Sequence, residues 1–153
     1  MVKKMVITVL ASGVFDLLHY GHIRFLEEAK HLVGKNSKLV VIVARDKTVI
    51  RMKGRRPVIP EDQRRALVEA LEVVDEALLG YEDMDLDSVI ERIKPDVIAV
   101  GYDQDEIEEI TRAIVEEKGL KLRIIKVGRF GMKDLDSSSK IKGKIVEDWR
   151  SKP

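Results

Sequence analysis

Apolar residues recur along the chain in short runs that alternate with helical patterns. The strand-like runs are Met5–Leu10, Leu39–Ala44, Glu76–Leu79, Val97–Gly101 and Leu122–Val127. The first run is apolar at every position except Thr8, which is typical of a parallel strand covered on both faces. Strands that alternate with helices favour βαβ units. We therefore expect an α/β fold with a single Rossmann-like, doubly wound parallel sheet of five strands.

The first helix is predicted immediately after the first strand and its loop. Ile23, Leu26, Ala29 and Val33 recur at spacings of three, three and four residues, which places them on one face of a helix. We expect this helix to begin near Tyr20. The loop between Leu10 and Tyr20 therefore lies at a strand-to-helix turn, where open α/β sheets bind their ligands.

A second helix is predicted from Pro60. Proline is tolerated in the first turn of a helix, and the acids Glu61 and Asp62 are favourable at its positive end. We expect its buried stripe to consist of Leu67, Leu71 and Val74.

Two more helices are predicted from their end signals. Asp87 or Ser88 can cap a short helix that ends before Pro95, because the residue before proline disfavours helical geometry. A later helix carries Ile107, Ile110 and Ile114, and Gly119 closes it.

Composition bounds the class of protein. The 153 residues, 44% of them hydrophobic, predict one domain over residues 1–153. No apolar run approaches the length of a membrane span, and the first strand is too short for the core of a signal peptide. We expect a cytoplasmic protein without a membrane partner. The absence of cysteine excludes zinc fingers, thiolate nucleophiles and disulfides.

Charge is segregated along the chain although the net charge is only +1. Arg45 to Arg65 contains eight Lys or Arg against three Asp or Glu, whereas Glu82 to Glu109 contains eleven acids against two bases. The near-neutral total argues against a nucleic-acid partner, which usually requires a broad basic face. The basic stretch instead suits a small anionic substrate.

The loop after the first strand carries two histidines where a phosphate-binding glycine motif would stand. Neither G-x-G-x-x-G nor G-x-x-x-x-G-K-[ST] occurs there. His19 and His22 are three residues apart, so they lie on one side of the first helical turn. Gly21 permits the close approach of a bulky anion. Free N–H groups at a helix start also bind phosphate, so we expect an anion site here.

The run GVFDLLHYGH, from Gly13 to His22, resembles the G-[TVC]-F-D-x-x-H-x-G-H loop of the cytidylyltransferase-like nucleotidyltransferases. The resemblance implies a sheet of the nucleotidyltransferase type. It also implies that His19 and His22 are catalytic, gripping the triphosphate and stabilising the α-phosphate during transfer. The same resemblance assigns the nucleotide and its phosphates to Gly13, Val14, Phe15, Tyr20 and Gly21, and the acceptor to Asp16.

A second group of candidate residues follows the second strand. Four cations surround a glycine and a proline in Arg51 to Pro57, which suggests a flexible lid. The stretch VIVARDKTVIRMKGRRPVIPEDQRRALVEALEVVDEALLG resembles the archaeal FAD synthases of the same family. By this resemblance Lys53 and Arg64 contact phosphates, whereas Asp46, Arg55 and Arg56 are assigned to the acceptor.

The last candidates follow the fourth and fifth strands. Asp103 stands in a G-x-D motif that lies in the nucleotide site of the family, where a carboxylate can accept hydrogen bonds from ribose hydroxyls or a base amine. Ser137, Ser138 and Ser139 match the family segment whose hydroxyls and helix start bind triphosphate, and at least one of them is expected to cap its helix. Arg129 is assigned to phosphate from its charge and location.

The resemblance implies that a phosphate oxygen attacks the α-phosphorus of a nucleoside triphosphate and expels pyrophosphate. The substrates it favours are ATP and FMN, giving FAD, with Mg²⁺ held mainly by phosphates and not directly by the protein. Glycerol-3-phosphate cytidylyltransferase, which uses CTP, is an alternative, as is a nucleotide-binding regulatory module without turnover. Relatives commonly form dimers, so a homodimer is expected.

Overall fold

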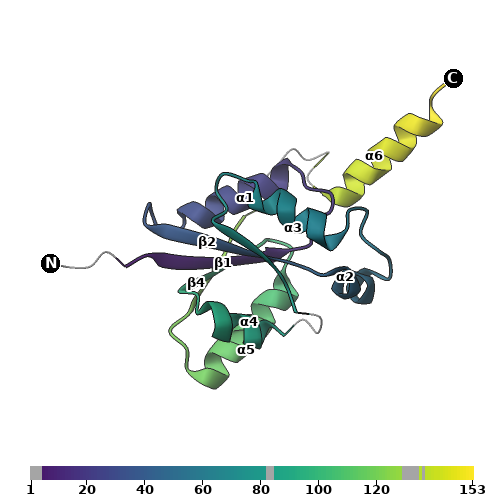
Figure 1. Ribbon diagram of the computed structural model, residues 1–153. Coiled ribbons are helices and arrows are strands. Elements are labelled where there is room, and N and C mark those ends of the chain that lie inside the picture. Colours follow the sequence, from purple (N-terminus) through teal and green to yellow (C-terminus); the bar gives the residue numbers. More distant parts are fainter. Residues whose placement is uncertain (1–4, 82–84, 129–134, 136) are drawn as a thin grey trace.

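Five parallel strands form one sheet in the order β3-β2-β1-β4-β5 (Figure 1). The computed structural model describes residues 5–81, 85–128, 135 and 137–153. In chain order the strands are β1 (Ile7–Gly13), β2 (Ser37–Val43), β3 (Glu76–Leu79), β4 (Val97–Val100) and β5 (Arg123–Lys126). Each predicted strand is present, and the predicted parallel α/β sheet is confirmed. β1 extends to Gly13, three residues beyond its predicted end.

Helices cover both faces of this sheet. In chain order the helices are α1 (Tyr20–His31), α2 (Asp46–Lys53), α3 (Glu61–Glu69), α4 (Leu86–Ile93), α5 (Asp105–Lys118) and α6 (Ser138–Arg150). Figure 1 shows α1 and α3 on one face and α4 and α5 on the other, whereas α6 projects away from the sheet. No helix among the described ranges is long and apolar enough to cross a membrane.

Aliphatic side chains pack on both faces of the sheet, which explains the unbroken apolar runs of its central strands. Val9 and Ala11 of β1 belong to the cluster that contains Leu26 of α1. Leu10, between them, belongs to the opposite cluster with Ile90 of α4. Burial of one such side chain contributes about 1.5–3 kcal/mol, so these two clusters hold the helices against the sheet.

The predicted buried stripe of α3 was only partly right. Leu67 is 44% exposed, and the residue that α3 packs against the core is its neighbour Val68. Leu71 and Val74 do pack against this core, but they lie in the turns beyond Glu69, where the helix ends. The helical spacing of Leu67, Leu71 and Val74 is therefore coincidental, because the last two residues lie beyond the end of the helix at Glu69.

The predicted helix ends are mostly confirmed. α1 begins at Tyr20, α4 ends at Ile93 just before Pro95, and α5 ends at Gly119, whose φ of 61° is left-handed. The predicted cap of α4 was wrong.

Asp85, and not Asp87 or Ser88, caps α4. The Asp85 carboxylate accepts a hydrogen bond from the Ser88 backbone N–H at 3.2 Å and another from the Ser88 hydroxyl. The serine that was predicted to cap the helix is therefore the donor to the cap.

The winding of the chain reverses at β1, which has β2 on one side and β4 on the other. Ligands of doubly wound sheets bind at such a switch point, outside the carboxyl ends of the strands. The pairing of β1 with β4 covers only Val9 with Val97 and Leu10 with Ile98. The two strands thus separate before Gly13, the last residue of β1, and this separation opens toward the candidate site.

Candidate active site

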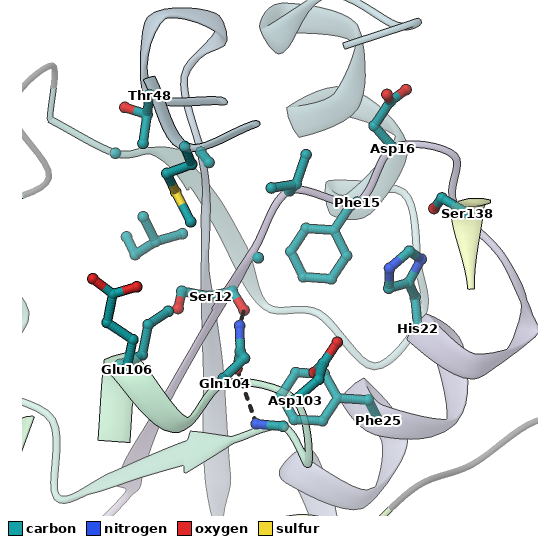
Figure 2. A pocket seen from close by; sticks show the side chains of 18 of the residues that line it. Ser12, Phe15, Asp16, His22, Phe25, Thr48, Asp103, Gln104, Glu106 and Ser138 are labelled. Atoms are coloured by element: carbon teal, nitrogen blue, oxygen red, sulfur yellow. Dashed lines mark hydrogen bonds between the residues drawn. The ribbon is translucent and has the colours of Figure 1, made fainter. Parts of the chain in front are cut away.

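A cavity of about 490 Å³ lies at the carboxyl ends of the strands (Figure 2). Its walls come from the loop after β1 and from α1, α2, α4, α5 and the start of α6. The predicted site residues that line it are Gly13, Val14, Phe15, Asp16, His19, Gly21, His22, Lys53, Asp103, Ser137, Ser138 and Ser139. The fold therefore brings together residues from distant parts of the sequence in one pocket.

His19 and His22 form a stacked pair at the start of α1. Their ring centroids are 3.7 Å apart with 27° between the planes. The backbone N–H of His19, the residue before the helix, donates to Nδ1 of His22 at 3.2 Å. The Phe15 ring packs edge-on against His22 with centroids 5.2 Å apart. These contacts fix the His22 ring in one orientation against the loop after β1.

The charge state of His22 is set by its surroundings. Burial, and then the nearby charges of His19 and Lys53, lower the pKa of His22 to about 3. The ring is therefore neutral near pH 7 when no ligand is bound. Because Nδ1 accepts from the His19 backbone, Nε2 carries the proton. His22 thus offers one N–H donor to an incoming anion.

Arg64 occupies a different place from the one predicted. Its side chain is fully buried (0% exposed) behind the loop, and it does not line the pocket. Nε donates to the Ile59 carbonyl at 2.8 Å, and Nη1 donates to the carbonyls of Val14 and Ala44 at 2.8 and 2.7 Å. Nη2 pairs with Asp46 at 2.7 Å. The donors of Arg64 hold backbone carbonyls in place, so a direct phosphate contact does not fit this geometry.

Asp46 and Asp16 also have structural partners. Asp46, assigned to the acceptor, pairs with Arg64 and does not line the pocket. The Asp16 carboxylate lines the pocket but accepts from the backbone N–H groups of Val58 and Ile59 at 2.8 and 3.0 Å. Asp16 therefore ties the histidine loop to the segment that leads into α3.

The cationic segment is not a lid over its whole length. α2 continues through Arg51 to Lys53 and ends at Gly54, whose φ of 72° stops the helix. Lys53 lines the pocket, near enough to His22 to influence its pKa. Arg55 and Arg56, assigned to the acceptor, are exposed and do not line the pocket. Only the first part of the predicted segment therefore reaches the site.

The start of α6 forms part of the pocket wall beside the histidine loop. Ser137 caps this helix by accepting from the Lys140 backbone N–H at 3.2 Å, as expected for one of the serines. Ser138 donates to the Leu17 carbonyl at 3.0 Å, which joins α6 to the histidine loop. Tyr20 is exposed and does not line the pocket. Arg129 lies outside the described residues.

The sequence of this chain matches known proteins over most of its length. Residues 10–145 match the cytidylyltransferase-like family. The chain belongs to the cytidylyltransferase-like family. Among relatives it is 44% identical over 142 residues to an FAD synthase of Methanopyrus kandleri, covering 93% of each chain. It is 49% identical over 138 residues to an FAD synthase of Ferroglobus placidus, covering 90% of this chain and 87% of the relative.

A solved structure of this family type supports the same fold. The structure of a lipopolysaccharide core biosynthesis protein from Thermoplasma volcanium is 41% identical to this chain and superposes with a TM-score of 0.73. The match covers 82% of this chain and 98% of the other. The cytidylyltransferase-like sheet and its surrounding helices are therefore shared by an experimental structure.

The sequence motifs missed the apolar half of the pocket. It is lined by residues of β2, α2, α4 and α5, namely Ile42, Met52, Leu86, Val89, Ile107 and Ile110. Thr48 lies at this side and is 2% exposed, and its hydroxyl has no hydrogen-bond partner among the residues that the structure describes. The sequence pattern identifies Ile107 and Ile110 only as residues of a helix. That they line the pocket follows from the position of α5 beside the strand ends.

Within residues 5–81, 85–128, 135 and 137–153 there is no group of three or more His, Cys, Asp or Glu side chains placed to hold a metal ion.

Proposed function

We propose that this chain is an FAD synthase, which transfers the AMP group of ATP to FMN and releases pyrophosphate. The observation that carries the proposal is the 44–49% identity to FAD synthases over about 90% of the chain. The pocket supports it, because it joins a phosphate-binding histidine loop to an apolar wall. A flat flavin ring suits such a wall, whereas glycerol 3-phosphate has no apolar surface to bury there.

The reaction requires no nucleophile from the protein. An oxygen of the FMN phosphate attacks the α-phosphorus of ATP, and the new P–O bond forms as the bond from the α-phosphorus to the bridging oxygen breaks. Pyrophosphate leaves with the electron pair of that bond. Catalysis then depends on positioning and on stabilisation of the charge on the phosphoryl oxygens.

The protein supplies N–H and cationic groups for that charge. We assign His19 and His22 as hydrogen-bond donors to the α-phosphate, and Lys53 as a cation that contacts the phosphates. Ser138 and Ser139, at the start of α6, line the same pocket, and a helix start suits the triphosphate. We assign Asp103 to the ribose or base of the nucleotide. Mg²⁺, bound by phosphate oxygens, would neutralise further charge.

Alanine at either histidine should lower kcat. We expect His19→Ala or His22→Ala to reduce kcat by about two to four powers of ten, the scale of losing one preorganised donor. The measurement is steady-state pyrophosphate release at saturating substrates. Turnover near wild type in either variant would contradict the assigned role of these donors.

The substrates are tested by pyrophosphate release in a matrix of donors and acceptors. ATP and CTP are each combined with FMN, glycerol 3-phosphate, phosphocholine and pantetheine phosphate. We expect release only with ATP and FMN. Release only with CTP and glycerol 3-phosphate would replace the proposal with a cytidylyltransferase. Release with none of the pairs, together with measurable nucleotide binding, would indicate a regulatory module.

The expected assembly and location also remain proposals. We propose a homodimer, supported by α6, whose described side chains are not buried against the rest of the chain and which exposes Ile145, Val146 and Trp149. The cytoplasmic location stays a prediction from the sequence.

A further inference from the structure

The side-chain amide of Gln104 joins two strands at the point where their backbones separate. Its Nε2 donates to the Ser12 carbonyl of β1 at 2.9 Å. Its Oε1 accepts from the backbone N–H of Gly101, just after β4, also at 2.9 Å. Figure 2 shows Gln104 held in this way beside Asp103. The backbone pairing of β1 with β4 ends earlier, at Leu10 and Ile98.

The amide therefore takes the place of a peptide group between the two strands. A peptide unit in a sheet also donates one hydrogen bond to one neighbour and accepts one from the other. By this bridge the strand ends are held apart by one amide width, at the switch point where the ligand crevice of a doubly wound sheet opens. Glutamine is suited to this role because it carries both a donor and an acceptor.

The position of Gln104 just before α5 shows that its side chain does not cap the helix. Gln104 is the residue before α5, yet its side chain makes no capping hydrogen bond. Serine, threonine, aspartate or asparagine would cap the helix there and stabilise it. The helix has no side-chain cap at this position, and the Gln104 amide donates to the Ser12 carbonyl instead.

Gly101 provides the space for this arrangement. A Cβ at Gly101 would lie 3.2 Å from Oδ1 of Asp103 and 3.4 Å from Oε1 of Gln104. Both side chains thus fold back over the end of β4. The glycine, the amide bridge and the Asp103 carboxylate therefore form one packed unit on the wall of the pocket.

We propose that Gln104 is a positioning residue for the nucleotide. Its amide sets the distance between Ser12, which leads into the phosphate-binding loop at Gly13, and the β4 turn that carries Asp103. The nucleotide has to reach both of these at once. This inference rests on the proposed function, because it assumes that ATP binds between the loop and Asp103.

The test compares two near-isosteric variants. Gln104→Glu loses the donor to Ser12 and places a carboxylate oxygen against a carbonyl oxygen, whereas Gln104→Leu loses both hydrogen bonds. We expect each variant to weaken ATP binding, measured by calorimetry without FMN, by about tenfold or more. In turnover, KM for ATP should rise by a similar factor while KM for FMN changes less than about twofold.

Protonation should rescue one variant and not the other. A protonated carboxyl group in Gln104→Glu regains an O–H donor for Ser12, so its binding defect relative to wild type should shrink between about pH 8 and about pH 5.5. Gln104→Leu should show no such recovery. A purely structural loosening of the loop would not respond to pH in only one variant.

Lys126→Ala is the matched control. Lys126 tethers the first turn of α5 to β5 by ion pairs with Asp105 and Glu108, and it does not line the pocket. Its loss loosens the same helix without changing the Gln104 bridge. We expect ATP binding to stay within about twofold of wild type.

Three results would overturn the proposal. These are wild-type ATP affinity in both Gln104 variants, an equal loss in Lys126→Ala, or a rise in KM for FMN that matches the rise for ATP. If a Gln104 variant fails to fold, Gly101→Ala takes its place, because the added methyl group presses on the amide and on Asp103. That variant should weaken ATP binding as well, and normal binding would count against the bridge.

Failure of the proposed function is a separate outcome. Calorimetry with ATP alone does not depend on the acceptor. A wild-type protein that binds ATP but does not convert FMN would therefore contradict the FAD synthase assignment and leave the bridge testable.

Discussion

At the scale of single residues, His22 combines a neutral ring with a fixed orientation. The His19 backbone N–H occupies Nδ1, so the remaining proton lies on Nε2. In the free protein, burial and the neighbouring charges of His19 and Lys53 lower the pKa of His22 to about 3. A bound triphosphate changes this balance, because a nearby anion favours the protonated form.

ATP should therefore raise the pKa of His22. In an NMR titration of the free protein, the His22 ring should stay neutral as the pH is lowered through 6.5, the ordinary histidine value, and protonate only near pH 3. With ATP bound, protonation should occur at a higher pH, because the phosphates offset the repulsion by Lys53. His22→Ala identifies the resonance. An unchanged pKa on ATP binding would contradict a contact between His22 and the phosphates.

Arg64 was assigned to phosphate by family resemblance, but in the structure its side chain holds the protein backbone. It is fully buried, and its guanidinium holds the carbonyls of Val14, Ala44 and Ile59 as well as Asp46. Removal of the guanidinium takes this donor from four partly buried acceptors at once, and leaving such groups unpaired is costly.

Arg64→Met should therefore destabilise the protein strongly. We expect a loss of about 3–5 kcal/mol in the free energy of unfolding, measured by chemical denaturation. Arg65→Met is the control, because Arg65 forms a partly exposed pair with Glu69 at 2.7 Å and should cost less than about 1 kcal/mol. Equal losses of unfolding free energy in the two variants would contradict the claim that the Arg64 network stabilises the protein more than a surface ion pair does.

At the scale of elements, helix ends decide what reaches the pocket. α2 ends at Gly54, which leaves Lys53 at the pocket and Arg55 and Arg56 outside its lining. α6 begins at Ser138, whose hydroxyl binds the Leu17 carbonyl of the histidine loop. The end of α2 and the start of α6 thus bring Lys53 and Ser138 to the pocket beside the loop after β1.

The cap of α4 gives a direct test of an element boundary. Asp85→Ala removes the acceptor for the Ser88 backbone N–H and should lower the free energy of unfolding by about 1 kcal/mol. Asp87→Ala, the control, removes an exposed ion pair with Lys118 and should cost less than about 0.5 kcal/mol. Both values come from denaturant unfolding. A larger loss of unfolding free energy in Asp87→Ala than in Asp85→Ala would favour Asp87 as the cap, as predicted from the sequence.

At the scale of the whole molecule, α6 projects from the body of the protein (Figure 1). None of the side chains of α6 is buried, and Trp149 near its end is 72% exposed. An exposed apolar helix face is typical of a surface that another chain covers. The proposed homodimer would give this face a partner.

Trp149→Glu should therefore shift the assembly toward monomer. Light scattering after size-exclusion chromatography should give twice the chain mass for wild type and a lower mass for the variant, because a charge at an apolar interface opposes association. Lys144→Glu on the same helix, an exposed position paired with Asp148, is the control for a change of charge alone. A monomeric wild type would refute the homodimer.

The sequence by itself determined the elements and their class. Apolar runs without alternation predicted buried parallel strands, and glycine or proline signals located the ends of α4 and α5. These signals are local, because the backbone conformations of glycine and proline do not depend on distant residues. The histidine loop was found in the same way, from spacing within a single turn of helix.

Only the tertiary structure decided which candidate side chains face the pocket. Arg64 and Arg65 are neighbours with the same chemistry, yet one is buried in a network and the other pairs at the surface. Gln104 carries no local signal, because its partner Ser12 is 92 residues away. The sequence records which groups are present, whereas the packing of strands and helices determines whether a group binds the backbone or remains available to a ligand.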